Sequence, residues 1–178
     1  DGSNVLPAST LNFDSEMKSP FISVLTATRN CAPDLEITAD SIRMQTYGDF
    51  EWVIQDCRSD DAIEELVSDS SLSAVFLSEP DRGIYDALNK ATRRALGEWI
   101  LVLGAGDWLA GPTALEQLVN GLSSSTHIAI CNVFEVTVDG VIHRRACDHP
   151  SSKLELLGDF SNHQQYKHFL DRKSTRLN

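Results

Sequence analysis

The sequence predicts a single α/β domain in which a mostly parallel sheet lies between two layers of helices. Short runs of β-branched and aromatic residues alternate with amphipathic segments of helical period along most of the chain. Parallel strands that alternate with helices are joined by right-handed crossovers, which place helices on both faces of the sheet. The length of 178 residues and the hydrophobic content of 42% suffice for one core but not for two.

The first half of the chain supplies three predicted strands and two predicted helices. The strands are the apolar runs FISVLTAT (21–28), EWVIQD (51–56) and SAVFLSEP (73–80). A helix begins at Pro33 and ends near TYGDF (46–50), and Asp60 caps a second helix, DAIEELVS (61–68). The apolar side chains expected on or near one face of the first helix are Leu35, Ile37, Ile42 and Met44.

The second half continues the alternation. A helix is predicted from about Ile84 to Leu96, with Gly97 as its left-handed C-terminal cap. WILVL (99–103) is the next strand, TALEQLVNGL (113–122) the next helix and HIAICNVFEV (127–136) a further strand. The turn VDG (138–140) leads into VIHRRA (141–146), which predicts a β-hairpin at the edge of the sheet.

Both ends of the chain differ from this pattern. Residues 1–20 are polar and show no period, so we expect a flexible leader there. The last eight residues, DRKSTRLN (171–178), match the translation of a common sequencing-library adapter. We therefore expect residues 171–178 to be a non-native tail and residues 21–170 to form a domain that is incomplete at its C-terminus.

Charge and cysteine content restrict the classes of partner. A formal net charge of -11 makes a broad basic surface for nucleic acid improbable, so no nucleic-acid partner is expected. The four cysteines are widely separated and form no CxxC pair, which favours a reducing compartment over a disulfide scaffold. No apolar run reaches the roughly 20 residues of a membrane-spanning helix. We expect a cytoplasmic protein, with the inner face of the membrane as an alternative location for the full-length form.

Polar residues gather where the predicted strands end. In an open parallel sheet, ligands bind outside the carboxyl ends of the strands, where the loops converge. That edge collects the loop 26–30 after the first strand, Asp56 after the second, residues 79–82 after the third and Asp107 after the fourth. The sequence thus predicts a ligand site at this edge.

Three stretches resemble a known family. ISVLTATRN, QTYGDFEWVIQDCRSDD and SEPDRGIYDALNKATRRALGEWILVLGAGDWL resemble, in order and spacing, the first half of a family-2 glycosyltransferase with the Rossmann-like GT-A fold, a three-layer α/β/α sandwich. The block EPDRGIYDALNKA is the most specific part. The resemblance implies a bacterial enzyme of polysaccharide biosynthesis, hexosyltransferase-like, that moves a sugar from a nucleotide-diphosphate donor to a saccharide or lipid-linked acceptor. It also implies a divalent cation, Mn²⁺ or Mg²⁺.

The resemblance assigns candidate donor contacts. It places Asp56 where the family carries an acid that contacts the nucleobase, with a turn-forming aspartate as the alternative. Arg82 follows a strand end and is expected to reach a donor phosphate or a uracil-type base, with an ordinary surface arginine as the alternative. The complete set of implied nucleotide-sugar contacts is Thr26, Ala27, Thr28, Asn30, Asp56, Asp81, Arg82, Gly106 and Asp107.

The implied metal site rests on one acid. Asp107 stands where the family carries the last acid of a DxD-like motif, but Gly104 and Gly106 occupy positions where relatives often have Asn or Asp. A single carboxylate suffices for a cation that the donor phosphates and water mostly coordinate, so binding without donor should be weak. His163, in an HQ pair with Gln164, is a second candidate ligand. The alternatives are a turn cap at Asp107 and a polar loop at His163.

Two functions therefore stay open at this level. The first is a glycosyltransferase, in which a carboxylate base would activate the acceptor hydroxyl while the cation neutralises the departing diphosphate. The family's base usually lies in the later half, so the catalytic residue here is unknown and we expect this chain to bind donor without completing transfer. The second is a catalytically silent nucleotide-sugar binding module, which is favoured by the presence of only one acidic residue in the metal motif. Peripheral membrane association of the full-length protein is a further expectation.

Overall fold

A computed structural model describes residues 19–69, 72–131, 133–136, 140, 142–145 and 169–172. The four helices of this part are α1 (Ala32–Arg43), α2 (Ile63–Asp69), α3 (Ile84–Arg94) and α4 (Ala114–Asn120). Its strands are β1 (Ile22–Thr28), β2 (Phe50–Asp56), β3 (Ala74–Ser78), β4 (Trp99–Val102), β5 (Ile128–Ile130), β6 (Val133–Val136), β7 (Ile142–Arg145) and β8 (Phe169–Arg172). None of the helices in these ranges has the length and apolar content that crossing a bilayer requires.

The main sheet has the order β3-β2-β1-β4-β8-β5. Strands β3, β2, β1 and β4 are parallel, whereas β8 is antiparallel to both β4 and β5. Thr28 pairs with Asp56 across β1 and β2, and Asp56 pairs with Ser78 across β2 and β3. Three parallel strands therefore end side by side, and this register brings the polar residues after them to one edge.

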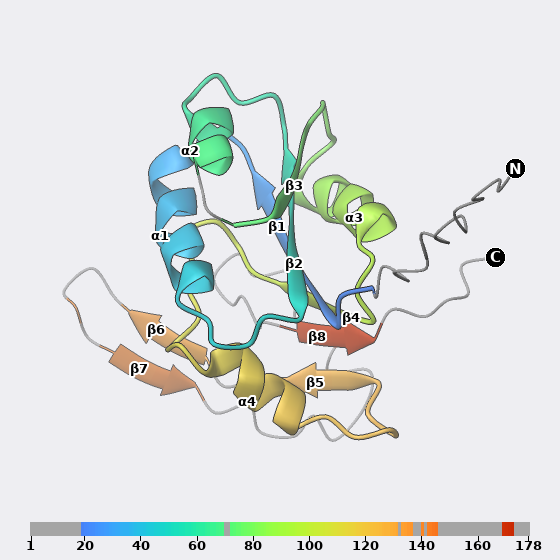
Figure 1. The fold of residues 1–178 in the computed structure, drawn as a ribbon. Helices are drawn as coiled ribbons and strands as arrows, with labels where there is room; N and C mark the ends of the chain where they lie inside the picture. Colours follow the sequence, from blue (N-terminus) through green and yellow to red (C-terminus); the bar gives the residue numbers. More distant parts are fainter. Residues whose placement is uncertain are drawn as a thin grey trace, which may run out of the picture.

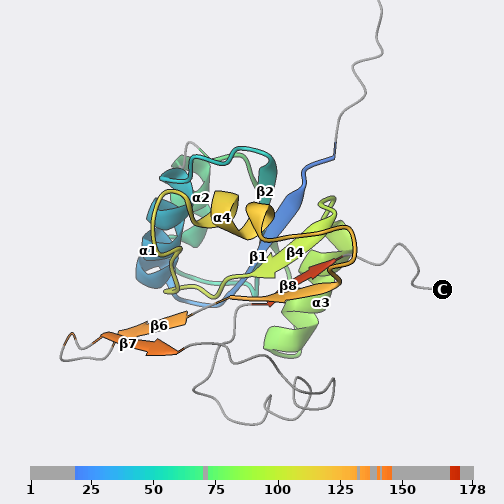
Figure 2. The same cartoon turned by 90° about the horizontal axis from the view of Figure 1, so that it is seen from below.

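Helices cover both faces of the sheet (Figures 1 and 2). On one face, apolar side chains of α1, α2 and α4 pack against alternate residues of β1, β2 and β4, such as Val24, Trp52 and Leu101. On the other face, Ala91 and Ala95 of the α3 segment pack against Leu25, Val53 and Ile100. The sequence prediction of a three-layer α/β/α sandwich with a mostly parallel sheet is confirmed.

The α1 helix buries a different set of residues from the one that its hydrophobic pattern indicates. Pro33 lies in its first turn, where a missing N–H costs no hydrogen bond. Leu35 and Ile42 are buried as predicted, but Ile37 and Met44 are exposed. Small or polar residues, such as the fully buried Thr38, complete the packed face instead. The choice of face was therefore partly wrong, because hydrophobicity alone did not identify the residues that pack against the loop after β4.

Gly97 has a different role from the predicted left-handed helix cap. It is absent from the glycines with positive φ, and α3 ends at Arg94 with an extended residue, Ala95, as its cap. A Cβ atom at Gly97 would lie 2.5 Å from the backbone nitrogen of Ser23. Glycine is needed there because the connection to β4 passes directly over β1.

The segment 127–136 forms two strands rather than one, which corrects the predicted single strand. Strand β5 joins the main sheet, while β6 pairs with β7 in a separate two-stranded sheet. The β6–β7 hairpin is confirmed, but its predicted place at the edge of the main sheet is wrong. Figure 1 shows the hairpin set apart from the main sheet.

Strand β8 reaches past the predicted end of the native domain at Leu170. Asp171 and Arg172 pair with Ile100 and Trp99 of β4, so two residues of the DRKSTRLN segment belong to the sheet. Residues 1–18 of the predicted leader and residues 173–178 of the predicted tail lie outside the described residues. The character expected for those segments stays a prediction.

Candidate functional site

The candidate site lies at the carboxyl ends of β1, β2, β3 and β4, where four loops begin. Asp56 is the last residue of β2 and stands between Thr28 of β1 and Ser78 of β3. Asp107 lies in the loop that follows β4, on the other side of β1 in the strand order. The topology therefore brings most of the predicted contacts to one edge of the sheet.

Asp56 is the centre of a hydrogen-bonded cluster. Its Oδ1 accepts bonds from the Thr28 hydroxyl at 3.1 Å and from the Ser59 hydroxyl. Its Oδ2 accepts bonds from the Ser78 hydroxyl at 2.5 Å and from the Ser59 backbone N–H at 2.9 Å. Since a carboxylate has about four lone-pair sites, these four donors use its accepting capacity. A nucleobase at Asp56 would have to displace one of the hydroxyls.

The environment of Asp56 favours its charged form. Burial opposes ionisation, because only 1% of the residue is exposed. The hydrogen bonds from Ser59, Ser78 and Thr28 outweigh this effect and hold the pKa of Asp56 below its ordinary value. Asp56 is thus a fixed anion that orders the ends of three strands.

The loop after β1 is tied to the loop after β2 by reciprocal bonds. The Asn30 N–H donates to the Ser59 hydroxyl at 2.8 Å, and Asn30 Oδ1 accepts from the Asp60 N–H at 3.0 Å. Asn30 holds a left-handed backbone with φ of 48°, which asparagine tolerates better than most residues. The first N–H of α1, at Ala32, donates to Asp61 Oδ2 at 2.8 Å. Asp61 therefore caps α1. Helix α2 begins at Ile63, two residues later than predicted, so Asp60 does not stand directly before its first turn.

The three threonine and alanine candidates of β1 have different surroundings. Thr26 is fully buried, and its hydroxyl donates to the Leu103 carbonyl at 2.8 Å while accepting from the Trp52 indole at 2.9 Å. Its side chain belongs to the core, so any donor contact there would have to involve its backbone. Ala27 is half-buried, and Thr28 lies at the edge with its hydroxyl on Asp56.

Thr38 of α1 fixes the backbone of the Asp107 loop through its side-chain hydroxyl. The Thr38 hydroxyl donates to the Asp107 carbonyl at 2.8 Å and lies 3.2 Å from the Gly104 carbonyl. It also accepts from the Gly106 N–H at 3.0 Å. The same N–H lies 3.1 Å from the Asp34 carbonyl. One buried side chain thereby sets the backbone of the turn that carries the half-buried Asp107.

Both glycines of this turn have a geometric reason. Gly106 has φ of +91°, a conformation that L side chains rarely adopt. A Cβ atom at Gly104 would lie 2.8 Å from Asp107 Oδ2, so the Asp107 carboxylate folds back over the place a side chain would take. The geometry of this turn therefore explains why glycine, rather than the Asn or Asp common in the family, occupies positions 104 and 106.

The side chains available at this edge determine which cation could bind. Among the described residues there is no group of three or more His, Cys, Asp or Glu side chains that could hold a metal ion. Asp107 supplies one hard oxygen ligand, which fits Mn²⁺ or Mg²⁺ with phosphate and water as the remaining ligands and does not fit an all-protein cage. His163, the second candidate ligand, lies outside the described residues.

Asp81 and Arg82 occupy the turn between β3 and α3. Asp81 Oδ1 accepts from the Gly83 N–H at 2.8 Å, which stabilises a turn whose Gly83 has φ of 114°. The Arg82 N–H donates to Asp86 Oδ2 at 3.1 Å. The Arg82 side chain is 91% exposed and only 3.8 Å from the Asp86 carboxylate through Nη2, a weak surface ion pair. Its guanidinium is available to an anionic ligand.

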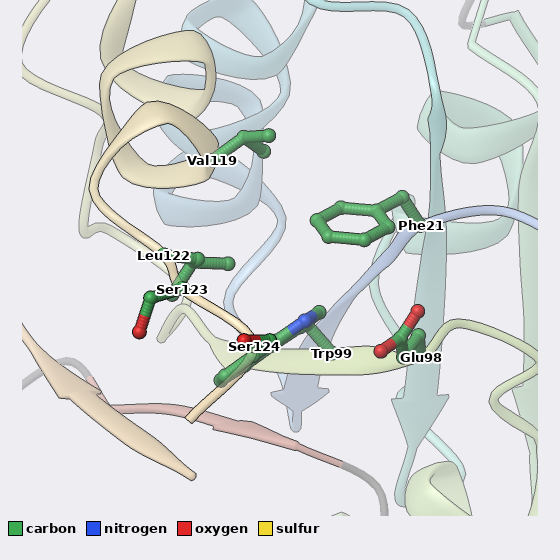
Figure 3. A pocket seen from close by; sticks show the side chains of 7 residues that line it. All are labelled: Phe21, Glu98, Trp99, Val119, Leu122, Ser123 and Ser124. Carbon is green, nitrogen blue, oxygen red and sulfur yellow. The ribbon is translucent and has the colours of Figure 1, made fainter. Parts of the chain in front are cut away.

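A hollow of about 330 Å³ lies at the opposite edge of the sheet. It is lined by residues near the amino ends of β1 and β4 and by the end of α4, and Figure 3 shows the Phe21 ring directed toward Val119 and Leu122. Parallel sheets bind ligands at the carboxyl edge, so this hollow is separate from the candidate site.

Sequence reasoning missed the residues that support the site. Thr38, Ser59, Asp61 and Ser78 bond to the predicted contacts or to the loops beside them. The sequence contained a signal for Ser59 alone, because an aspartate side chain in a turn often accepts a hydrogen bond from the backbone N–H of a residue shortly after it. The others act across 22 to 69 residues of sequence separation, which no local pattern reveals.

The comparison with known families is decisive at this point. The family described as glycosyl transferase family 2 matches residues 23–173, which include every described element except the first residue of β1. The chain belongs to glycosyl transferase family 2. The family predicted from the three sequence stretches is therefore confirmed.

Curated relatives agree with this membership. The chain is 39% identical over 109 residues to a PGL/p-HBAD biosynthesis glycosyltransferase of Mycobacterium bovis, a match that covers 57% of this chain and 41% of the relative. It is 27% identical over 119 residues to the putative glycosyltransferase EpsH of Bacillus subtilis, covering 65% and 34%. The matched region thus spans about two fifths or less of the relatives' own length.

Solved structures agree on the fold. The mannosyltransferase PcManGT of Pyrobaculum calidifontis, in complex with GDP-Man and Mn²⁺, matches with a TM-score of 0.56 and 27% identity over 63% of this chain and 35% of that one. TarS 1-349 of S. aureus, in complex with UDP-GlcNAc, matches with a TM-score of 0.53 and 22% identity over 56% and 30%. The fold is of the GT-A type, as the sequence resemblance implied.

Proposed function

We propose that this chain binds the nucleotide-diphosphate sugar of a glycosyltransferase at the carboxyl edge of its sheet. The observation that carries the proposal is the arrangement of Asp56, Arg82 and Asp107 at the carboxyl ends of β2, β3 and β4, along one edge of the sheet, in a family 2 chain. Asp56 orders the loops, Arg82 offers an exposed cation and Asp107 offers a carboxylate on a rigid turn. GDP-Man and Mn²⁺ in the similar mannosyltransferase support a nucleotide-sugar donor and a divalent cation here.

The chemistry proposed for the whole protein is transfer of the sugar to a saccharide or lipid-linked acceptor in cell-surface polysaccharide synthesis. When bound, the cation would neutralise charge on the diphosphate as it leaves. Asp107 would hold the cation, and Arg82 would approach the diphosphate from the turn after β3. The names of the relatives from Mycobacterium and Bacillus, both of which include the word glycosyltransferase, support sugar transfer. The sugar, the nucleotide and the acceptor are not specified by the described residues.

A second candidate function is a nucleotide-sugar binding module without transferase activity. The specific observation in its favour is the single carboxylate at Asp107, with Gly104 and Gly106 beside it. The two functions differ in one measurable property, because a transferase releases nucleotide diphosphate from a donor and a binding module retains the donor.

The location of the protein is also a proposal. The thiols of Cys31 and Cys57 form no disulfide bond, which supports a reducing compartment. We place the whole protein in the cytoplasm, with peripheral association at the inner face of the membrane where a lipid-linked acceptor would be presented.

The proposal is tested by calorimetric titration of the chain with UDP, GDP and dTDP in the presence of Mn²⁺. At least one nucleotide diphosphate should bind, and binding should weaken when the cation is removed with a chelator. The absence of heat with all three nucleotides at millimolar protein would reject the proposed site.

A further inference from the structure

A network of charged side chains links α3 to the turn that carries Asp81 and Arg82. Lys90 Nζ donates to the carbonyl of Pro80 at the start of this turn. The same ammonium lies 3.6 Å from Glu79 Oε1 and 3.5 Å from Asp86 Oδ2. The Lys90 side chain is only 18% exposed, so it is held against the turn rather than extended into solvent.

Asp86 transmits this restraint to Arg82. The Asp86 carboxylate lies between the Lys90 ammonium and the backbone N–H of Arg82, which donates to Oδ2 at 3.1 Å. This bond from Arg82, with Lys90 nearby, lowers the pKa of Asp86 and keeps it ionised. The backbone of Arg82 is thereby fixed while its guanidinium stays exposed.

Arg94 anchors the other end of the network to the sheet. Its Nη1 donates to Oε1 of the buried Gln55 at 2.6 Å, and its Nη2 lies 3.0 Å from Glu79 Oε1. The hydrogen bond from Arg94 lowers the pKa of Glu79. The Glu79 N–H donates to the Asp56 carbonyl at 3.0 Å, so the network begins beside the Asp56 cluster.

The charges within this network balance. Glu79 and Asp86 carry two negative charges, and Lys90 and Arg94 carry two positive charges. Asp81 and Arg82 add one charge of each sign, so the turn is neutral overall, and Arg82 is the exposed cation at the rim where an anionic diphosphate is proposed to bind.

We propose that Lys90 is a positioning residue for the donor site, because it fixes the turn 80–83 and so aims Arg82 at the diphosphate. This inference rests on the proposed function and deepens it. Lys90 would not contact the donor itself. Its contribution would pass through Pro80 and Asp86 to Arg82, so removing Lys90 should matter only while Arg82 is present.

The first test needs no ligand and uses limited digestion with trypsin, followed by mass spectrometry. In Lys90→Met the rate of cleavage after Arg82 should rise roughly 10-fold, because the turn loses charge-assisted bonds. Cleavage after Arg58, in the loop after β2, should stay unchanged and excludes general unfolding. Arg93→Met is the matched control, since Arg93 is an exposed cation of α3 outside this network. An unchanged rate after Arg82 would overturn the inference.

The second test is a double-mutant cycle on the affinity for the tightest-binding nucleotide diphosphate among UDP, GDP and dTDP, with Mn²⁺. Lys90→Met should weaken binding roughly 5-fold in the wild-type background and have little effect in Arg82→Gln. Equal effects in both backgrounds would show that Lys90 does not act through Arg82, and would overturn the inference alone. If the wild type binds no nucleotide diphosphate, the proposed function fails and the donor role of Lys90 fails with it.

Discussion

Thr38 offers the sharpest way to disturb the Asp107 turn without touching Asp107. Its hydroxyl is fully buried, donates to the Asp107 carbonyl at 2.8 Å and accepts from the Gly106 N–H at 3.0 Å. Thr38→Val keeps the shape of the side chain and removes both bonds. The Gly106 N–H would keep its contact with the Asp34 carbonyl at 3.1 Å, so the main loss is the hydroxyl donor that faces the Asp107 and Gly104 carbonyls.

The size of the effect follows from these contacts. Removing a hydrogen-bond donor from a carbonyl inside a protein costs about 1–3 kcal/mol, and the partial burial of the Asp107 carbonyl and the remaining bond of Gly106 place Thr38→Val near the lower end. The free energy of unfolding should therefore fall by about 1–2 kcal/mol. If the turn that carries Asp107 is destabilised by the same free energy, it should bind the cation less tightly. The Mn²⁺-dependent affinity for nucleotide should then fall about 5- to 30-fold.

The assay combines urea unfolding with calorimetric titration of nucleotide diphosphate and Mn²⁺. Thr38→Ser is the matched control, because it keeps the hydroxyl and should retain most of the affinity. If Thr38→Val loses stability but binds nucleotide with Mn²⁺ as tightly as the wild type, the rigid turn is not needed for the cation and the reasoning is refuted.

Two further predictions concern stability. The ionised Asp56 stabilises the fold above the ordinary carboxyl pKa, and this contribution is lost as the pH falls through its lowered pKa. The free energy of unfolding of Asp56→Asn should therefore be about 1–3 kcal/mol lower than that of the wild type at pH 7. Asp56→Asn should also lose less stability than the wild type between about pH 5 and pH 2. Urea unfolding that gives the same loss of stability for both proteins over this pH range would contradict the prediction. Gly97→Ala should cost about 2–4 kcal/mol because its Cβ would meet the Ser23 backbone at 2.5 Å. Gly48→Ala, with nothing within 4 Å, should be nearly neutral, and equal melting temperatures of the two variants would reject the argument.

The layered fold was predictable from the sequence because its elements are local and strongly patterned. Each of β1, β2 and β4 is a short apolar run, and the helices between them have a helical period. The rule that ligands gather at the carboxyl edge then collected Asp56, Arg82 and Asp107 without any coordinates.

The parts that could not be predicted depend on contacts between distant residues. Strand β8 pairs with β4 across about 70 residues, and nothing in FLDR (169–172) indicates which strand it will join. Gly97 has the sequence position of a helix cap, but its requirement comes from the backbone of Ser23. The bond from Thr38 to the Asp107 loop spans 69 residues and is equally invisible to local pattern.

The central proposal is that one carboxylate, Asp107, holds the cation that binds the donor diphosphate. The most direct measurement is the ratio of nucleotide diphosphate affinities with and without Mn²⁺, in the wild type, in Asp107→Asn and in the control Asp40→Asn. Asp40 is an exposed acid of α1 paired with Arg43. We predict that Mn²⁺ strengthens binding in the wild type and in Asp40→Asn, whereas Asp107→Asn loses this gain at a cost of about 1–3 kcal/mol. The same gain from Mn²⁺ in all three proteins would contradict the proposal and show that Asp107 only shapes the turn.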